Sequence, residues 1–428
     1  MLKRTQMSPI AATLLLLSSQ AHAVSSGELS LGAQQFATES APGSRADLKA
    51  DLRSESVLSY GGVETGIPVR QADFFLLYES GSNGEHGFDV DNLVQRWGLG
   101  SGHLWLGRVH PGAEGRTDSV VSSTSAIGAS WAQNQGDALA PRVSGWIGTG
   151  LHLRSANGMF ATLAYSPLFL PSFGPRVTYS DTATAQGSRF GRLPPQTVQI
   201  GGANPLPLYY RIDAGDVLKI VRQDQAWFSL GKEFESLRVE ALAWTAPSPN
   251  PSVSTSALVQ SGVSGADVLV TVSPSFVRET FAGGAVESTK ASLPARLEAL
   301  NETGTGRWVV SARVSPLRPL ELGWLNTFER ETGVAAAAPA GASVSSPVYA
   351  KNLWWLGLSS PENWKLRPSL RVEQQPGQGG WVRPGFTWAA DKHTQVFAQA
   401  SVITGLDKTW FGTWRSLDSV SMGARILW

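Results

Sequence analysis

The sequence predicts an all-β fold, a transmembrane antiparallel up-and-down β-barrel of about 16 to 18 strands. Three observations predict it. Apolar and polar residues alternate in several long segments, which is the side-chain period of a strand. The chain begins with a secretion signal. After that signal, no apolar run approaches the ~20 residues that a membrane-crossing helix needs. Charged residues are 16% and hydrophobic residues 42% of the 428, which suits neither an average soluble domain nor a helical membrane protein.

Residues 1–23 are predicted to be a cleaved signal peptide. Lys3 and Arg4 precede the apolar run Ile10 to Leu17, and Ala21-His22-Ala23 gives the small-x-small cleavage pattern, so the mature chain begins at Val24. A short N-terminal anchor helix is the alternative, but the run is too short to span a bilayer. Because the chain has no cysteine, a lipid-anchored form, disulfides and thiol chemistry are excluded.

Four segments show the strand period most clearly, and each has one apolar face. They are 46–53, 307–314, 365–372 and 419–428. One apolar face suits a soluble sandwich or a membrane barrel. The secretion signal, the strand lengths and the near-continuous succession of strands favour the barrel, which must close because hydrocarbon cannot hydrogen-bond an open edge. We therefore expect residues 24–428 to form one outer-membrane barrel.

The last segment carries a family resemblance. Its apolar residues fall at every second position back from a terminal aromatic residue, at Val420, Met422, Ala424, Ile426 and Trp428. This resembles the C-terminal assembly signal of Gram-negative outer-membrane β-barrels, although Phe is more usual than Trp at the end. The segment Leu104 to Val109 reads Leu-Trp-Leu-Gly-Arg-Val and looks like the Leu-Gly-Arg strand of general porins. The resemblance implies a porin-like protein of the bacterial outer membrane. It also implies three partners, namely membrane lipid, lipopolysaccharide and the barrel-assembly machinery.

Connections between the predicted strands alternate in length, as in bacterial barrels. Counted back from a last strand that descends to the periplasm, the outer segments are 405–416, 375–380 and 332–347, and the inner ones are 391–393, 359–364 and 316–319. A Pro- and Ser-rich stretch, 246–265, is expected to be another outer loop. The exception is 282–292, which would be a long inner turn and indicates a misplaced strand nearby.

The N-terminal half is less regular. Segments 142–154 and 159–166 predict a hairpin closed near Asn157-Gly158. The Pro-rich stretch at about 167–225 predicts one long loop, with a short strand near 217–222. It could fold into the lumen and narrow it, or form an extracellular cap packed on other loops. The strand candidates number 19 or 20, more than the mature chain accommodates. Those near 28–37, 90–98 and 217–222 are therefore expected to be wrong or to belong to loops.

Charged residues fall on the faces opposite the lipid-facing residues, where they would line a pore. Placing them in lipid instead would cost ~2–4 kcal/mol for each Arg or Lys at the midplane. They could sort solutes by charge or form cross-strand ion pairs that keep the interior wet. The predicted pore-lining residues are Asp47, Lys49, Asp51, Arg53, Arg296, Glu298, Arg307, Arg313, Lys365, Arg367, Arg371 and Glu373.

Catalytic, metal and cofactor chemistry receive little support. The histidines lack metal-ligand spacing, and no Gly-x-Ser-x-Gly elbow is present. His152 has Ser144 and Asp137 nearby in sequence, but such neighbours arise by chance in a chain this rich in serine. Trp410 and Trp414 could stack on sugars, although aromatic loop residues usually pack. Removing Lys3 and Arg4 leaves 33 of 35 basic residues against 34 acidic ones, which does not indicate nucleic acid.

The expected function is passive diffusion of small hydrophilic solutes through a porin-like channel. No enzyme activity, catalytic residue, metal or cofactor is expected, and the oligomeric state is open. Two alternatives remain, namely a surface-exposed structural barrel with an obstructed lumen and an outer-membrane hydrolase.

Overall fold

The structure is a computed structural model in which strands dominate. It describes residues 26–36, 54–64, 70–79, 86–114, 145–170, 177–178, 180, 186–187, 195–199, 204–213, 215–248, 252–262, 265–288, 290, 294–304, 306–317, 320–328, 352–361, 363–405 and 418–427. None of the helices within these ranges is long and apolar enough to cross a membrane.

One sheet of 18 strands contains most of the described chain. Its first nine strands are β1 (Ser26–Phe36), β2 (Ser54–Glu64), β3 (Arg70–Glu79), β4 (His86–Leu99), β5 (Gly102–Val109), β6 (Trp146–Arg154), β7 (Met159–Leu168), β12 (Gln225–Glu233) and β13 (Leu237–Pro247). The other nine are β16 (Arg278–Ser288), β17 (Ala295–Glu302), β18 (Arg307–Leu317), β19 (Leu320–Phe328), β20 (Leu353–Ser359), β21 (Leu366–Gln375), β22 (Gly379–Ala389), β23 (Thr394–Gly405) and β24 (Ser419–Leu427).

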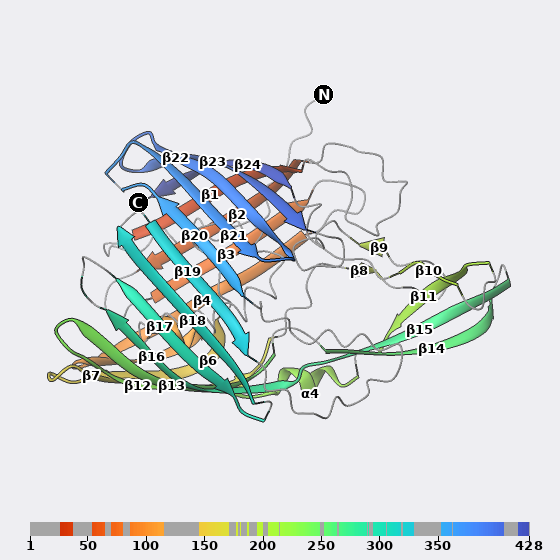
Figure 1. Ribbon diagram of the computed structural model, residues 1–428, viewed down its shortest axis with the longest axis horizontal. Helices are drawn as coiled ribbons and strands as arrows, with labels where there is room; N and C mark the ends of the chain where they lie inside the picture. Colours follow the sequence, from red (N-terminus) through yellow and green to blue (C-terminus); the bar gives the residue numbers. More distant parts are fainter. Residues whose placement is uncertain are drawn as a thin grey trace.

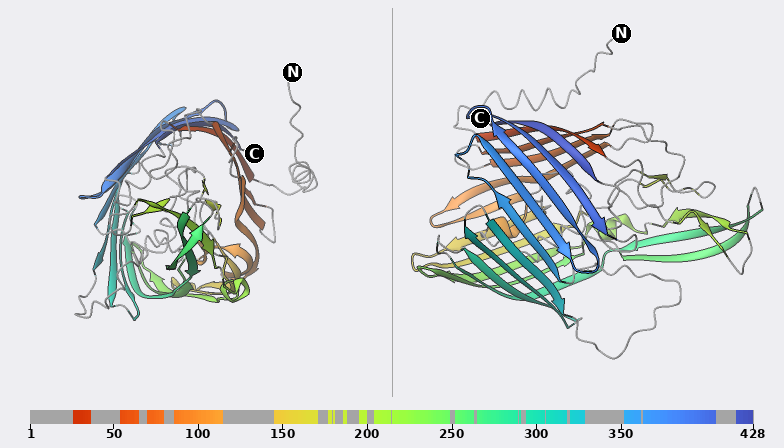
Figure 2. Two further views of the ribbon diagram at one scale, coloured as in Figure 1. Left: turned by 90° about the vertical axis from the view of Figure 1, so that its right-hand side faces the viewer. Right: turned by 45° about the horizontal axis from the view of Figure 1, so that its top comes forward.

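The sheet closes on itself. Each strand pairs antiparallel with the next along this order, including β7 with β12 and β13 with β16. The first strand, β1, pairs with both β2 and β24, so the ring has no free edge. Figure 2, left, shows the strands arranged around a central space. The predicted antiparallel barrel is thus confirmed, with the even strand number at the upper end of the expected range.

A second, smaller sheet extends beyond one end of the barrel (Figure 1). Its long hairpin consists of β14 (Ser252–Gly262) and β15 (Gly265–Ser275). β11 (Leu206–Ile212) pairs in parallel with β15 and antiparallel with β10 (Thr197–Val198). A two-residue pair, β8 (Val177–Thr178) and β9 (Gln186–Gly187), is separate. The described end of the Pro-rich stretch therefore pairs with the hairpin β14–β15. Whether the whole stretch narrows the lumen or caps the barrel stays a prediction.

The hairpin β14–β15 explains the irregular loop at 282–292. We expected 246–265 to be an outer loop, but 252–262 forms the strand β14, and β14 and β15 leave the barrel between β13 and β16. The barrel strand β16 covers Arg278–Ser288, so the inner turn shrinks to 289–294. The longest connections, such as 329–352 and 406–418, share one end of the barrel, and turns such as 318–319 and 390–393 belong to the other. The expected alternation fails at 303–306 and 376–378, which are short although they belong to the end with the long connections.

Three strand expectations need correction. Segments 28–37 and 90–98, which we expected to be false, correspond to the barrel strands β1 and β4. The short strand expected near 217–222 is instead the helix α4 (Val217–Val221), whose N-cap Asp216 accepts hydrogen bonds from the backbone N–H groups of Leu218 and Lys219. An N-cap carboxylate satisfies donors that a helix start leaves free, which explains the helix.

The predicted hairpin between β6 and β7 is confirmed. The backbone N–H of Ser155 donates to the carbonyl of Met159, and Gly158 takes a positive φ of 81° that suits glycine. Residues 46–53 lie outside the described residues, so the strand expected there is not tested. The strands expected at 307–314, 365–372 and 419–428 correspond to β18, β21 and β24.

The two faces of the barrel wall differ in exposure. Directly opposed residues share a face, and one such row crosses five strands at Glu240, Ala285, Glu298, Ser311 and Leu325. All five are buried. The alternate positions carry exposed apolar side chains, such as Val239, Val286 and Leu297. We assign the buried face to the interior of the barrel, because only the interior is enclosed.

An aspartate closes the turn between β22 and β23. The Asp391 carboxylate accepts hydrogen bonds from the backbone N–H groups of His393 and Thr394, at 2.7 and 2.8 Å. The His393 hydrogen bond is the largest of the effects that lower the pKa of Asp391. Because the folded pKa lies below the unfolded value, this carboxylate stabilises the fold above the unfolded pKa of about 3.9.

We therefore predict that Asp391→Ala lowers the free energy of unfolding at neutral pH. The difference from the parent protein should shrink as the pH falls through the lowered pKa, because protonation removes the charged acceptor. Urea unfolding of refolded barrels between pH 7 and pH 3 measures this. A difference that does not change across that range would contradict the prediction.

Candidate functional site: the inner wall of the barrel

Charged side chains form a connected chain on the inner wall, from β12 to β17. Arg238 lies 3.7 Å from Glu233 and 3.8 Å from Glu240. Arg296 lies 3.6 Å from the other oxygen of Glu240 and 3.2 Å from Glu287. We call these five residues the ionic row. Arg238, Glu240 and Arg296 are buried, and burying charges is tolerated only when they are paired.

The ionic row continues onto β18. Glu298 has no exposed surface, and its carboxylate accepts a hydrogen bond of 3.4 Å from the Ser311 hydroxyl. Further along the same two strands, the buried Arg307 and Glu302 form an ion pair. Side chains facing a wide, empty lumen would keep contact with water. Their burial shows that the chain itself covers this part of the inner wall.

An aromatic row lies on the same wall. On β13 it passes through Trp244, whereas the ionic row passes through Glu240. The ring of Trp227 stacks on Trp244 at 5.3 Å between centroids, and Trp244 stacks on Phe281 at 5.0 Å. Trp146 meets Trp227 edge to face at 6.3 Å. These residues come from β6, β12, β13 and β16, and they belong to one apolar cluster that also contains Trp105 and Val309.

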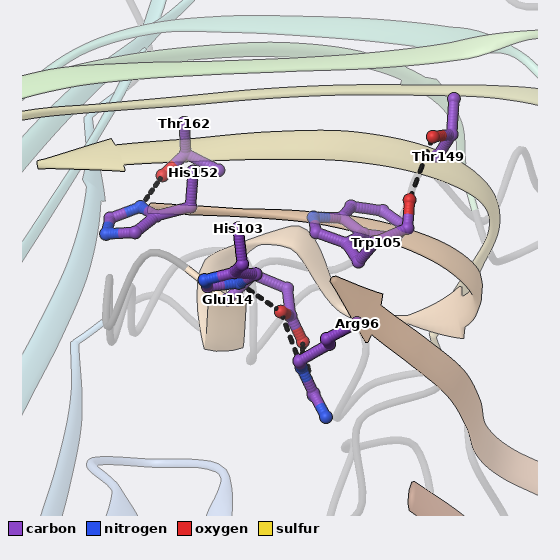
Figure 3. A network of polar contacts seen from close by, with 7 residues as sticks. All are labelled: Arg96, His103, Trp105, Glu114, Thr149, His152 and Thr162. Carbon is purple, nitrogen blue, oxygen red and sulfur yellow. Dashed lines mark hydrogen bonds and ion pairs between the residues drawn. The ribbon is translucent and has the colours of Figure 1, made fainter. Parts of the chain in front are cut away.

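A short helix, α2 (Pro111–Glu114), follows β5 and brings one carboxylate to the wall. The Glu114 carboxylate accepts hydrogen bonds from Arg96 Nε at 2.8 and 3.1 Å and from Arg96 Nη2 at 2.5 Å. It also lies 2.8 Å from His103 Nε2, which donates because an ionised carboxylate can only accept. Figure 3 shows Arg96 and His103 converging on Glu114. We call these three residues the carboxylate clamp.

Two further residues extend the clamp along the wall. His152 lies directly opposite His103 on the neighbouring strand, with ring centroids 5.4 Å apart. The Nδ1 of His152 lies 2.9 Å from the Thr162 hydroxyl on β7 (Figure 3). The hydrolase alternative relied on His152 with Ser144 or Asp137. Both of those residues lie outside the described residues, and the contacts of His152 in the structure are with His103 and Thr162.

The predicted pore-lining residues fall into three groups. Asp47, Lys49, Asp51 and Arg53 lie outside the described residues. Arg296, Glu298 and Arg307 are all buried on β17 and β18; Arg296 belongs to the ionic row, whereas Arg307 pairs with Glu302 further along the strands. Arg313 lies directly opposite Arg296, and Arg371 pairs with Glu373 at 2.7 Å. Arg367 lies on β21, whereas the exposed Lys365 precedes it. Whether these residues line an open pore stays a prediction.

Several inner-wall residues were missed from the sequence. Arg238 and Glu240 belong to β13, in which the inward positions change from charged residues to Leu242 and Trp244. That change hides the alternation. Arg96, His103 and Glu114 gave no local signal beyond their charge, because their association depends on how a segment between two strands folds back.

The residues of the C-terminal signal occupy β24. Val420, Met422 and Ile426 are exposed, and Ala424 is half-buried. β24 pairs with β23 and β1, so these residues lie at the closure of the barrel. Trp428, the last residue of the signal, lies outside the described residues, as do Trp410 and Trp414, which we considered for sugar stacking. Recognition by the assembly machinery stays a prediction.

Comparisons with known proteins find similarity in overall architecture. No protein-family model and no curated protein matches the chain. Among solved structures, Salmonella typhi OmpF in complex with daunomycin matches at 11% identity over 94% of this chain and 97% of that one, with a TM-score of 0.42. Two mutants of Rhodopseudomonas blastica porin match at 8% and 9% identity, with TM-scores of 0.37 and 0.35. Both matches cover 94% of this chain and 99% of those chains.

Proposed function

We propose that the chain is an outer-membrane channel through which small hydrophilic solutes diffuse passively. The observation that carries the proposal is the contrast between the two faces of a closed barrel. Charged side chains occupy the inner face, and large apolar side chains are exposed on the outer face, as at Glu298 and Leu297. A sheet of this kind is stable where lipid surrounds it and water reaches its lumen.

The exposed apolar side chains support a membrane location. They recur on the outer face of strands around the ring, for example at Leu106, Leu163, Phe228, Leu322, Phe386 and Val420. Soluble monomers rarely expose apolar patches larger than a few hundred Å². In lipid the same surface needs no further partner. The longest connections also share one end of the barrel, as in bacterial outer-membrane proteins.

Charges that water can reach are the best candidates for selecting solutes. Arg371 and Glu373 on β21 keep 15% and 17% of their side chains exposed, whereas Arg238, Glu240 and Arg296 in the ionic row keep 7% or less. The proposed pore-lining set is Arg296, Glu298, Arg307, Arg313, Lys365, Arg367, Arg371 and Glu373, together with Asp47, Lys49, Asp51 and Arg53. Within this set, fixed charges facing water would attract the opposite ion.

Planar-bilayer recording tests both the channel and this selectivity. The purified barrel is expected to give a steady ion current. Arg371→Gln should shift the reversal potential in a salt gradient towards cations, and Glu373→Gln should shift it towards anions. The heat-denatured protein is the control for leakage. A folded barrel that inserts without steady current would overturn the proposal.

The buried inner wall favours a second candidate, a surface-exposed structural barrel with an obstructed lumen. Glu298, Ser311 and Leu325 lie opposite one another, and all three are covered. This candidate predicts correct insertion without current, so the same recording separates the two. Protection of the projecting hairpin β14–β15 from protease by a surface partner would support it further.

A further inference from the structure

The carboxylate clamp has the composition of a binding site for an anion. Arg96 offers both Nε and Nη2 to one carboxylate, and His103 Nε2 completes the contact at 2.8 Å. Paired donors in this arrangement are the preferred partners of a carboxylate group, because the planar guanidinium matches both of its oxygens. We propose that Arg96 and His103 form a binding site for small carboxylate solutes, and that Glu114 occupies it as a tethered internal ligand.

The donors belong to the rigid wall, whereas the carboxylate does not. Arg96 lies on β4 and His103 on β5, which are paired neighbours. Glu114 ends the four-residue helix α2, in the long segment between β5 and β6. A site that persists without its ligand needs donors held by fixed elements, and strands hold them better than a loop does. The wall therefore forms the site, and the loop supplies the ligand.

The exposed fractions of the side chains also distinguish the two donors from the carboxylate. The Glu114 side chain is 2% exposed, while Arg96 and His103 keep 19% and 25%. The donors therefore keep some surface accessible to solvent beside the carboxylate that they hold. His152 lies opposite His103 on the neighbouring strand β6, and Arg154, two residues further along β6, is already paired with Glu233.

The inference deepens the proposed function and rests on it, because a solute reaches the site only through the lumen. A tethered competitor reduces the apparent affinity of a solute by the fraction of time that the site is free. Its effective concentration, set by the short tether, is on the order of millimolar. Removing the charge of Glu114 should therefore expose a site that is weak in the parent protein.

Calorimetric titration with succinate, on the folded barrel in detergent, tests this. We expect Glu114→Gln to bind succinate about tenfold more tightly than the parent protein, because the internal carboxylate no longer competes. Glu114→Asp, which withdraws the carboxylate by one methylene group, should lie between them. Arg96→Gln combined with Glu114→Gln should abolish the gain. Succinamide, which has the same shape without charge, should not bind.

Asp224→Asn is the matched control. Asp224 forms an exposed ion pair with Arg278 at 2.5 Å, away from the clamp, and this variant should bind succinate like the parent protein. Folding of each variant is checked by the shift in gel mobility between unheated and heated samples. If Glu114→Gln does not fold, the succinate affinity of Glu114→Asp is compared with that of the parent protein instead. Equal succinate affinity in the folded Glu114 variants and Asp224→Asn would overturn the inference, because the clamp would then be only a structural ion pair.

The channel proposal can fail separately from this inference. Succinate binding without any bilayer current would retain the site and reject the open channel. Current without a change in succinate binding would retain the channel and reject the site. If both hold, succinate should block the current through Glu114→Gln at lower concentrations than it blocks the parent channel, again by about tenfold.

Discussion

Replacing Arg296 with alanine is expected to lower the free energy of unfolding by about 3–5 kcal/mol. Arg296 is the buried cation between Glu240 and Glu287 in the ionic row, at 3.6 and 3.2 Å. Its removal leaves Glu240 in a covered position with one partner fewer. The cost comes mainly from this uncompensated buried carboxylate, because the net value of a complete buried ion pair is small.

Urea unfolding of barrels refolded into phospholipid vesicles measures the loss. Arg278→Ala is the matched control, because Arg278 pairs with the exposed Asp224, and exposed pairs contribute about 0–1 kcal/mol. A double variant, Arg296→Met with Glu240→Gln, should lose less than Arg296→Ala, because the unpaired charge is removed as well. If Arg296→Ala costs no more than Arg278→Ala, then water reaches the ionic row and the wall is not covered.

The face on which Arg296 lies could be predicted from the sequence. In β17 the apolar Leu297 and Ala299 alternate with Arg296 and Glu298. A strand sends successive side chains to opposite faces, so eight residues suffice to assign them. The same local rule placed β18, β21 and β24 correctly. Faces and strand positions depend on near neighbours in sequence, and a single chain records those.

The partners of Arg296 could not be predicted in this way. Glu240 is on β13 and contacts Arg296 across β16, so the pairing needs the order of strands around the ring. We expected most of β14 to be an outer loop, and β14 and β15 in fact join the smaller sheet between two strands of the ring. Local sequence gives a strand its propensity but does not name the sheet that it joins.

The carboxylate clamp illustrates a further limit. Glu114 is a single acidic residue in a long connection, 110–145, and such residues usually face water. Its burial against Arg96 and His103 arises because the chain after β5 turns back along the wall that it has just formed. No periodic pattern encodes this contact. The strand β4, which carries Arg96, was itself expected to be false, so neither the contact nor its frame could be predicted from the sequence.

Replacing Leu163 with arginine is the sharpest test of which face meets lipid. Leu163 lies near the middle of β7, and half of its side chain is exposed, at 50%, whereas the neighbouring Thr162 is fully buried. In lipid, an arginine near the midplane should cost about 2–4 kcal/mol, falling to about 0–1 kcal/mol near the interface. On a surface that faces water, the same change would stay within about 0.5 kcal/mol.

Leu237→Arg serves as the depth control, because Leu237 is also exposed but begins β13, at the end of the barrel with short turns. Leu163→Ala corrects for the lost apolar side chain. Unfolding in phospholipid vesicles should then rank Leu163→Arg well below Leu237→Arg in stability, since only the first arginine must leave water. Equal and small losses at both positions would mean that the exposed apolar face of this barrel is not in a membrane, and the channel proposal would fall with it.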